Sequence, residues 1–130
     1  MITEDYVSFE TAKLLKEKGF DWESIGYYVD DEPNDVKYSL LGETNSIWES
    51  RCCSAPTLQM AMKWLREIHD LNCQVMLDSW SEAYGSCGYY YMINQKNGGF
   101  REISPDDSIF FDSYEDAVEA AIEYCLEHLI

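Results

Sequence analysis

Apolar residues recur at helical spacing in the middle of the chain, across residues 54–72. One face of this stretch carries Leu58, Ala61, Met62, Leu65 and Ile68, and it is widened by Met60, Trp64 and Leu71. A face this wide is typical of a helix that is covered on more than one side. We therefore predict a central helix, capped by Ser54 with Pro56 in its first turn, whose most buried side chains are Leu58, Trp64, Leu65 and Ile68.

Two further helices are predicted at the ends of the chain. Ser8 precedes an amphipathic stretch that runs to Lys18, and Gly19 after it favours a left-handed stop. Ser113 precedes the cleanest helical periodicity in the sequence. Its apolar positions are Tyr114, Ala117, Val118, Ala121, Ile122, Cys125, Leu126 and Leu129.

Between the helices, short apolar runs alternate with turn residues and predict strands. The predicted strands are residues 27–29, 36–41, 47–48, 74–80, 87–93, 100–103 and 109–111. Residues 74–80 are apolar on both faces, which favours an interior strand, and Asn97-Gly98 is a strong hairpin signal. Strands joined by short turns pair antiparallel. We therefore predict one α+β domain over residues 1–130, an antiparallel sheet of about five to seven strands with about three helices packed mainly on one face.

Charge narrows the choice of partner. The 130 residues include 9 Lys and Arg against 25 Asp and Glu, a net charge of −16. Such a chain is repelled by phosphate backbones and by anionic lipid, so we expect no direct nucleic-acid binding and no membrane binding. The number of cysteines is five, so they cannot all pair in disulfides, and we recognise no secretory signal before the first helix. Both observations favour a cytoplasmic protein with free thiols.

Two stretches together resemble a known group of proteins, namely DYVSFETAKLLKEKGF at 5–20 and SAPTLQMAMKWLREIH at 54–69. The closing pattern that begins at Tyr114, YEDAVEA, fits the same group. The group consists of short uncharacterised proteins of gut Bacteroidetes and their phages or mobile elements. The resemblance implies a bacterial or phage accessory protein. It implies no activity, cofactor or catalytic residue.

Candidate chemistry in the sequence is sparse. The sequence offers one candidate set of zinc ligands: Cys53, His69 and Cys73, with Cys52 or Cys87 as the fourth. The paired short spacings of a structural zinc site are missing from this set. Cys52 or Cys53 just before a helix would gain reactivity from its positive end, yet neither histidine is placed as a base. Acidic side chains are too numerous to single out a catalytic pair. We expect no metal, no cofactor and no catalytic residue.

The remaining candidates are binding residues. Tyr89, Tyr90 and Tyr91 lie on a predicted strand and suit an aromatic recognition surface. Glu119, Glu123 and Glu127 lie four apart on the last helix, where we expect all three to face water. The favoured interpretation is a small acidic, non-enzymatic accessory protein that binds another protein, basic in character, with a homo-oligomer also compatible. The alternatives are an acidic nucleic-acid mimic that blocks a DNA-binding protein, and a small enzyme that uses a cysteine or a carboxylate pair.

Overall fold

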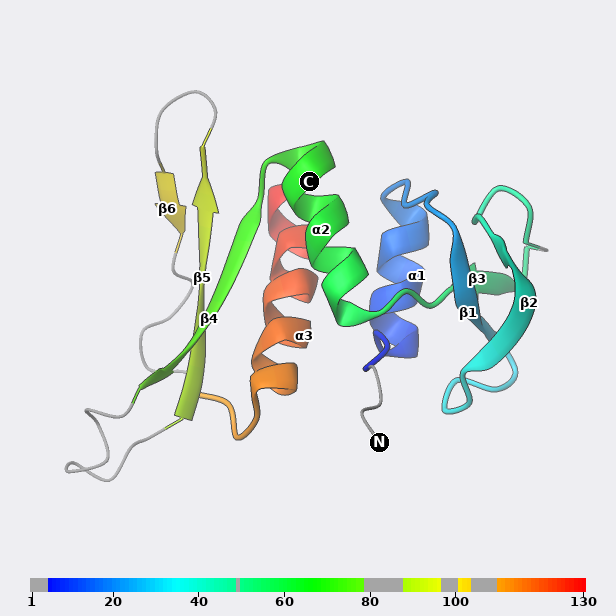
Figure 1. Ribbon diagram of the computed structural model, residues 1–130, viewed down its shortest axis with the longest axis horizontal. Coiled ribbons are helices and arrows are strands. Elements are labelled where there is room, and N and C mark those ends of the chain that lie inside the picture. Colours follow the sequence, from blue (N-terminus) through cyan, green and yellow to red (C-terminus); the bar gives the residue numbers. More distant parts are fainter. Residues whose placement is uncertain (1–4, 49, 79–87, 97–100, 104–109) are drawn as a thin grey trace.

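A computed structural model describes residues 5–48, 50–78, 88–96, 101–103 and 110–130 (Figure 1). In chain order its elements are α1 (Phe9–Glu17), β1 (Ser24–Val29), β2 (Lys37–Glu43), β3 (Cys52–Ser54), α2 (Leu58–His69), β4 (Asn72–Asp78), β5 (Gly88–Gln95), β6 (Arg101–Ile103), α3 (Tyr114–Tyr124) and the π-helical turn η2 (Cys125–Leu129). Within these ranges no helix is long and apolar enough to cross a bilayer.

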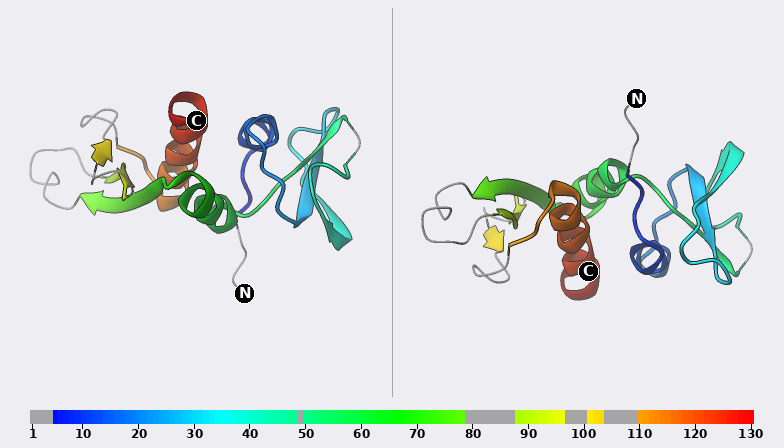
Figure 2. Two further views of the ribbon diagram at one scale, coloured as in Figure 1. Left: turned by 90° about the horizontal axis from the view of Figure 1, so that it is seen from above. Right: turned by 90° about the horizontal axis from the view of Figure 1, so that it is seen from below.

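The strands form two antiparallel sheets, ordered β2-β1-β3 and β4-β5-β6 within the described part of the chain. The helices lie between them: α1 packs on the first sheet, α3 packs on the second, and α2 contacts β4 and α3 (Figures 1 and 2). The α+β class is confirmed, but the single sheet was wrong. β4 follows α2 and pairs with β5 and with no described strand of the first sheet, so it belongs to a second sheet.

Local signals placed the first helix correctly. The Ser8 side chain accepts a hydrogen bond from the Thr11 amide, and the buried Val7 and Ala12 flank this cap. Gly19 has a φ of +94°, the left-handed conformation that glycine adopts without a steric penalty. The amide of Phe20 then donates to the Leu15 carbonyl at 2.9 Å and closes the helix end.

The central helix begins later than the sequence predicted. Thr57 caps it by accepting a hydrogen bond from the Met60 amide at 3.2 Å, whereas Ser54 belongs to β3 and pairs with Tyr27. Leu58, Trp64 and Leu65 are buried as expected. Ile68 is 56% exposed and Met60 37% exposed, so those two expectations were wrong. The described neighbours of α2 cover its inner side, and its other side faces solvent.

The last helix follows its pattern closely. Ser113 accepts a hydrogen bond from the Asp116 amide at 3.0 Å, and the inward stripe is fully buried at Ala117, Val118, Ala121, Ile122 and Cys125. The α-helix ends at Tyr124, and one wider π-helical turn carries the chain through Leu129. This stripe forms part of the core shared by the helices and the second sheet.

Several strand boundaries differ from the prediction. The hairpin of β1 and β2 is confirmed, but Ile47 and Trp48 lie in a turn, where the Ile47 amide donates to the Thr44 carbonyl. In the described part of the chain β4 pairs with β5 alone, so it is an edge strand and not an interior one. Phe111 forms a single bridge to Tyr89. Trp80, Cys87, Asn97-Gly98 and Ile109 lie outside the described residues.

Leu65 and Ile68 on α2 have side chains of the same size, but shortening each one to alanine should change stability by different amounts. Leu65 is fully buried, so Leu65→Ala should lower the free energy of unfolding by about 2–5 kcal/mol. Ile68→Ala, on the same helix but exposed, should change it by less than about 0.5 kcal/mol. Urea unfolding followed by circular dichroism measures both. Equal losses for the two variants would contradict this assignment of the inner face.

Candidate functional site

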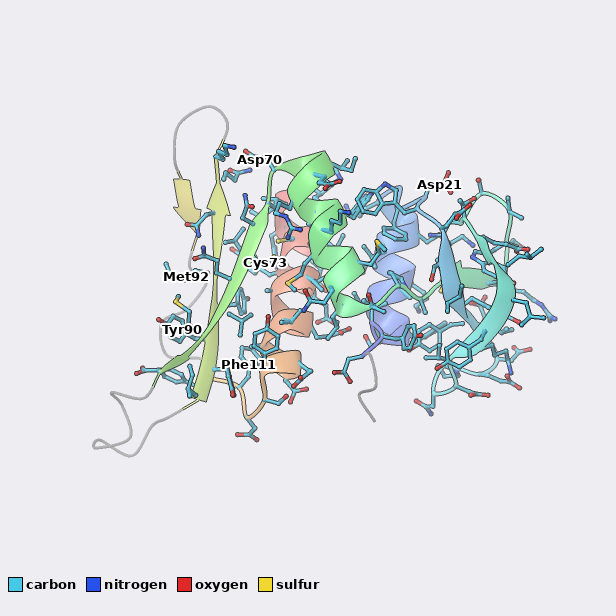
Figure 3. The ribbon with its side chains drawn as sticks, viewed as in Figure 1. Asp21, Asp70, Cys73, Tyr90, Met92 and Phe111 are labelled. Atoms are coloured by element: carbon cyan, nitrogen blue, oxygen red, sulfur yellow. The ribbon has the colours of Figure 1, made fainter. Side chains whose placement is uncertain are left out.

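The three predicted tyrosines do not share one face. Tyr89 and Tyr91 point from β5 toward α3, with ring centroids 6.2 Å from Tyr114 and 6.4 Å from Tyr124 respectively. Burial raises the pKa of Tyr91 to about 12. Tyr90 lies on the opposite face of the sheet, where its hydroxyl donates to the Met76 sulfur at 3.8 Å (Figure 3). The alternation of a strand therefore directs two of the three rings toward the helix.

Two of the three predicted acidic residues bind inside the protein. Glu119 accepts a hydrogen bond from the Ser8 amide at 2.8 Å, and Glu123 accepts one from the Thr11 hydroxyl at 2.9 Å. Both carboxylates are half-buried between α3 and α1, and Glu127 alone is exposed. The expectation that all three face water was therefore wrong for Glu119 and Glu123. The helical period identified the inner stripe of α3, but it could not show that α1 covers the flank of that stripe.

The cysteines fall into two separate places. The thiols of Cys73 on β4 and Cys125 on η2 lie 3.7 Å apart, whereas Cys52 and Cys53 lie on β3. The residues considered for zinc are not brought together, because His69 packs on the Trp64 ring at 4.7 Å, and the described residues contain no group of three or more potential metal ligands. Cys87 is outside the described residues.

A hollow of about 480 Å³ lies beside Cys52 and Cys53. Because α2 begins only at Leu58, neither thiol sits at a helix N-terminus as the sequence had suggested. Lys16 directs its ammonium group to the backbone carbonyls of Ser50 and Cys52, the latter at 2.6 Å. Burial raises the pKa of Cys53 to about 11, and the described lining includes no histidine. The raised pKa of Cys53 disfavours the thiolate that nucleophilic catalysis uses.

A second hollow runs between the start of β1 and the exposed side of α2. It consists of two adjoining depressions of about 500 and 270 Å³ that share Glu23 and Met60. We call it the β1–α2 groove, and its lining is Tyr6, Trp22, Glu23, Ser24, Ile25, Pro56, Thr57, Met60, Lys63 and Glu67. Ile25 is 51% exposed, so two large apolar side chains from different elements face solvent within one groove.

Local geometry fixes the walls of the β1–α2 groove. Tyr6 bridges to Thr57, and its ring lies against Gly26, where a β-carbon would meet the Ala55 carbonyl oxygen at 2.8 Å. A side chain at Gly26 would therefore push Tyr6 and the strand apart. On the other wall Met60, Lys63 and Glu67 follow one another along α2 at helical spacing. Helical spacing did not reveal this groove, because it places Met60 on the apolar inner face of the helix.

Comparison of the chain with protein-family models, with curated proteins and with solved structures finds no match. The resemblance to short proteins of gut Bacteroidetes and their mobile elements therefore stays a prediction.

The buried contact between Thr11 and Glu123 makes a prediction about pH and stability. Burial is the largest cause that raises the pKa of Glu123, and the charges of Glu119 and Glu127 add to the rise. The folded chain thus holds the Glu123 proton more tightly than the unfolded chain does. The free energy of unfolding therefore falls as pH rises from the pKa of Glu123 in the unfolded chain through its higher pKa in the folded chain. Glu123→Gln removes that loss and keeps an acceptor for Thr11, so at pH 7 it should be as stable as the wild type or slightly more stable.

Thr11→Val provides the matched comparison, because it removes the donor and leaves a half-buried carboxylate without its hydrogen bond. We expect it to lower the free energy of unfolding by about 1 kcal/mol at pH 7. Urea titrations at pH 4 and pH 7 measure both variants. A larger loss for Glu123→Gln than for Thr11→Val at pH 7 would contradict the contact described.

Thiol reactivity should follow burial. Cys125 is fully buried and Cys53 nearly so, while Cys52 is half-exposed. In a short pulse of iodoacetamide at pH 8, Cys52 should be alkylated well before Cys53 and Cys125, as read by peptide mass mapping. Because the pKa of Cys53 is about 11, its labelling rate should rise about tenfold per pH unit between pH 8 and 10. Labelling of Cys125 as fast as Cys52 would show that the helix end opens.

Proposed function

We propose that this chain is a non-enzymatic protein-binding module that takes a basic segment with an apolar anchor into the β1–α2 groove. The observation that carries the proposal is the exposure of Ile25 and Met60 within one groove that Trp22 also lines. Large apolar side chains that gather in a concave site mark binding surfaces more often than singly exposed ones do.

Size and shape favour a segment of polypeptide as the ligand. The two depressions adjoin along one side of α2, so the groove is elongated and open. Trp22 and Tyr6 at its walls are residue types that dominate the energetics of protein interfaces. An apolar side chain of the ligand would replace water over Ile25 and Met60, and burial of this area contributes about 25 cal/mol per Å² before the costs of association are counted.

The charge of the groove favours a basic ligand. Glu23 and Glu67 are exposed in its lining and Lys63 is its one cation among the described residues, within a chain of net charge −16. A Lys or Arg beside the apolar anchor would lie near these carboxylates, and the field of the whole chain would speed its approach. This charge balance supports the basic protein partner expected from the sequence, now at a different surface from Tyr89–Tyr91 and the last helix.

A random-peptide display library selected against the purified protein tests this proposal. We expect enrichment of peptides that carry an aliphatic or aromatic residue next to Lys or Arg, with binding that weakens as salt rises. Met60→Glu should reduce the affinity of the selected peptides by at least about tenfold, or roughly 1.4 kcal/mol, because it places a charge where the apolar anchor packs.

Ile68→Glu is the matched control, since it makes the same change on the same helix outside the groove lining. It should leave the affinity unchanged. Thermal unfolding of both variants verifies that they fold. Equal effects of the two substitutions, or enrichment of acidic peptides, would reject the groove as the binding site.

A further inference from the structure

The strand β2 lies at the edge of the first sheet, at one end of the molecule (Figures 1 and 2). Of the described strands only β1 pairs with it. Two of its side chains are the most exposed large apolar groups among the described residues: Leu40 is fully exposed and Leu41 is 74% exposed, and Tyr38 beside them is 62% exposed. An exposed apolar edge strand is a template on which another strand can pair.

The pairing of β2 with β1 explains this exposure. Ser24 pairs with Glu43 and Gly26 pairs with Tyr38, so residues 39–42 of β2 lie opposite Ile25 alone. This irregularity bends β2 away from β1 and directs Leu40 and Leu41 outward. No residue in the described part of the chain covers Leu40, and Leu41 is largely uncovered as well.

The sequence of β2, KYSLLGE, is complementary to itself about Leu40. When two copies are placed antiparallel with Leu40 opposite Leu40, Lys37 falls opposite Glu43 and Tyr38 falls opposite Gly42. The oppositely charged Lys37–Glu43 pair and the apolar Leu40–Leu40 contact are cross-strand pairs of the kind that stabilise antiparallel strands by roughly 0.2–1 kcal/mol each. Because the antiparallel arrangement is symmetric, each of these unlike pairs occurs twice.

We propose that β2 is the interface between two copies of this chain, paired antiparallel in the register centred on Leu40. The paired strands link the first sheets of the two copies edge to edge and bring Leu40 of one copy against Leu40 of the other, while Leu41, on the opposite face of the strand, falls opposite Ser39. The contact is isologous and closes after two copies, which is the commonest symmetry of soluble oligomers. The opposite charges at the two ends of β2 select a second copy over an unrelated apolar strand.

Charge elsewhere on the chain opposes this contact, and it predicts how the strength of the dimer depends on salt. Lys37 also pairs with Glu32 and Asp35 of the β1–β2 turn, and each copy carries a net charge of −16. Salt screens the repulsion between the copies, so the dimer should become stronger as ionic strength rises. Binding of a basic peptide in the β1–α2 groove should show the opposite dependence, which separates the two proposals.

Sedimentation equilibrium of the whole chain at low and high salt is the first test. We expect a monomer–dimer equilibrium that salt shifts toward dimer, and a loss of at least about tenfold in self-association for Leu40→Lys. Leu77→Lys, at a half-exposed leucine of the second sheet, should leave self-association unchanged. A chain that remains monomeric at every concentration and salt level would overturn the proposal.

A charge exchange tests the register itself. Lys37→Glu should weaken the dimer, and the double variant Lys37→Glu with Glu43→Lys should restore it, because the opposite charges face each other again. In addition, Leu40→Cys should form a disulfide between two copies when oxidised glutathione is supplied, since directly opposed residues lie near bonding distance. No restoration by the exchange and no link at position 40, or capture of a different strand at β2, would reject this interface.

Discussion

Packing among the three helices joins the two halves of this protein, and the contact between α1 and α3 is the part that hydrogen bonds define. Ser8 and Thr11 near the start of α1 donate hydrogen bonds to Glu119 and Glu123 of α3. The chain enters one sheet directly after α1 and leaves the other directly before α3, so these bonds join elements more than a hundred residues apart in sequence. A carboxylate that leaves water for such a site needs the donors it receives, because an unpaired half-buried charge is costly.

The packing of α1 on α3 also determines which surfaces of the chain remain exposed. With α1 and α3 packed on each other, each sheet turns one face toward the helices, and the edge strand β2 lies at one end of the molecule (Figure 1). The β1–α2 groove lies between the start of β1 and α2, so one of its walls comes from the first sheet and the other from the helix. Ile25 and Met60 are exposed in the groove and Leu40 and Leu41 on β2, while other exposed apolar side chains, such as Ile68 and Leu77, lie elsewhere.

Local signals determined what the sequence could predict. Ser8, Gly19 and Ser113 act within a few residues of themselves, and each was placed correctly. Ser54 was misassigned as a cap because its amide donates to the Asn45 side chain and its hydroxyl accepts from Trp48, both contacts of the tertiary fold. Hairpins fix which neighbouring strands pair, but they do not fix which hairpins share a sheet. Only packing separates the first sheet from the second.

The candidate surfaces were missed for a related reason. Periodicity shows that α2 has an apolar face. That face is wider than the area its neighbours cover, so Met60 and Ile68 are exposed. The pattern alone cannot tell a covered position from an exposed one. The same limit applies to acids: Glu123 and Glu127 are alike in sequence, yet one accepts a hydrogen bond from Thr11 and the other is exposed. Because carboxylates are engaged inside, net charge overstates what the last helix offers a partner. The field of a chain with net charge −16 still acts at long range, so it would attract a basic ligand and repel a second copy, and added salt would weaken both effects.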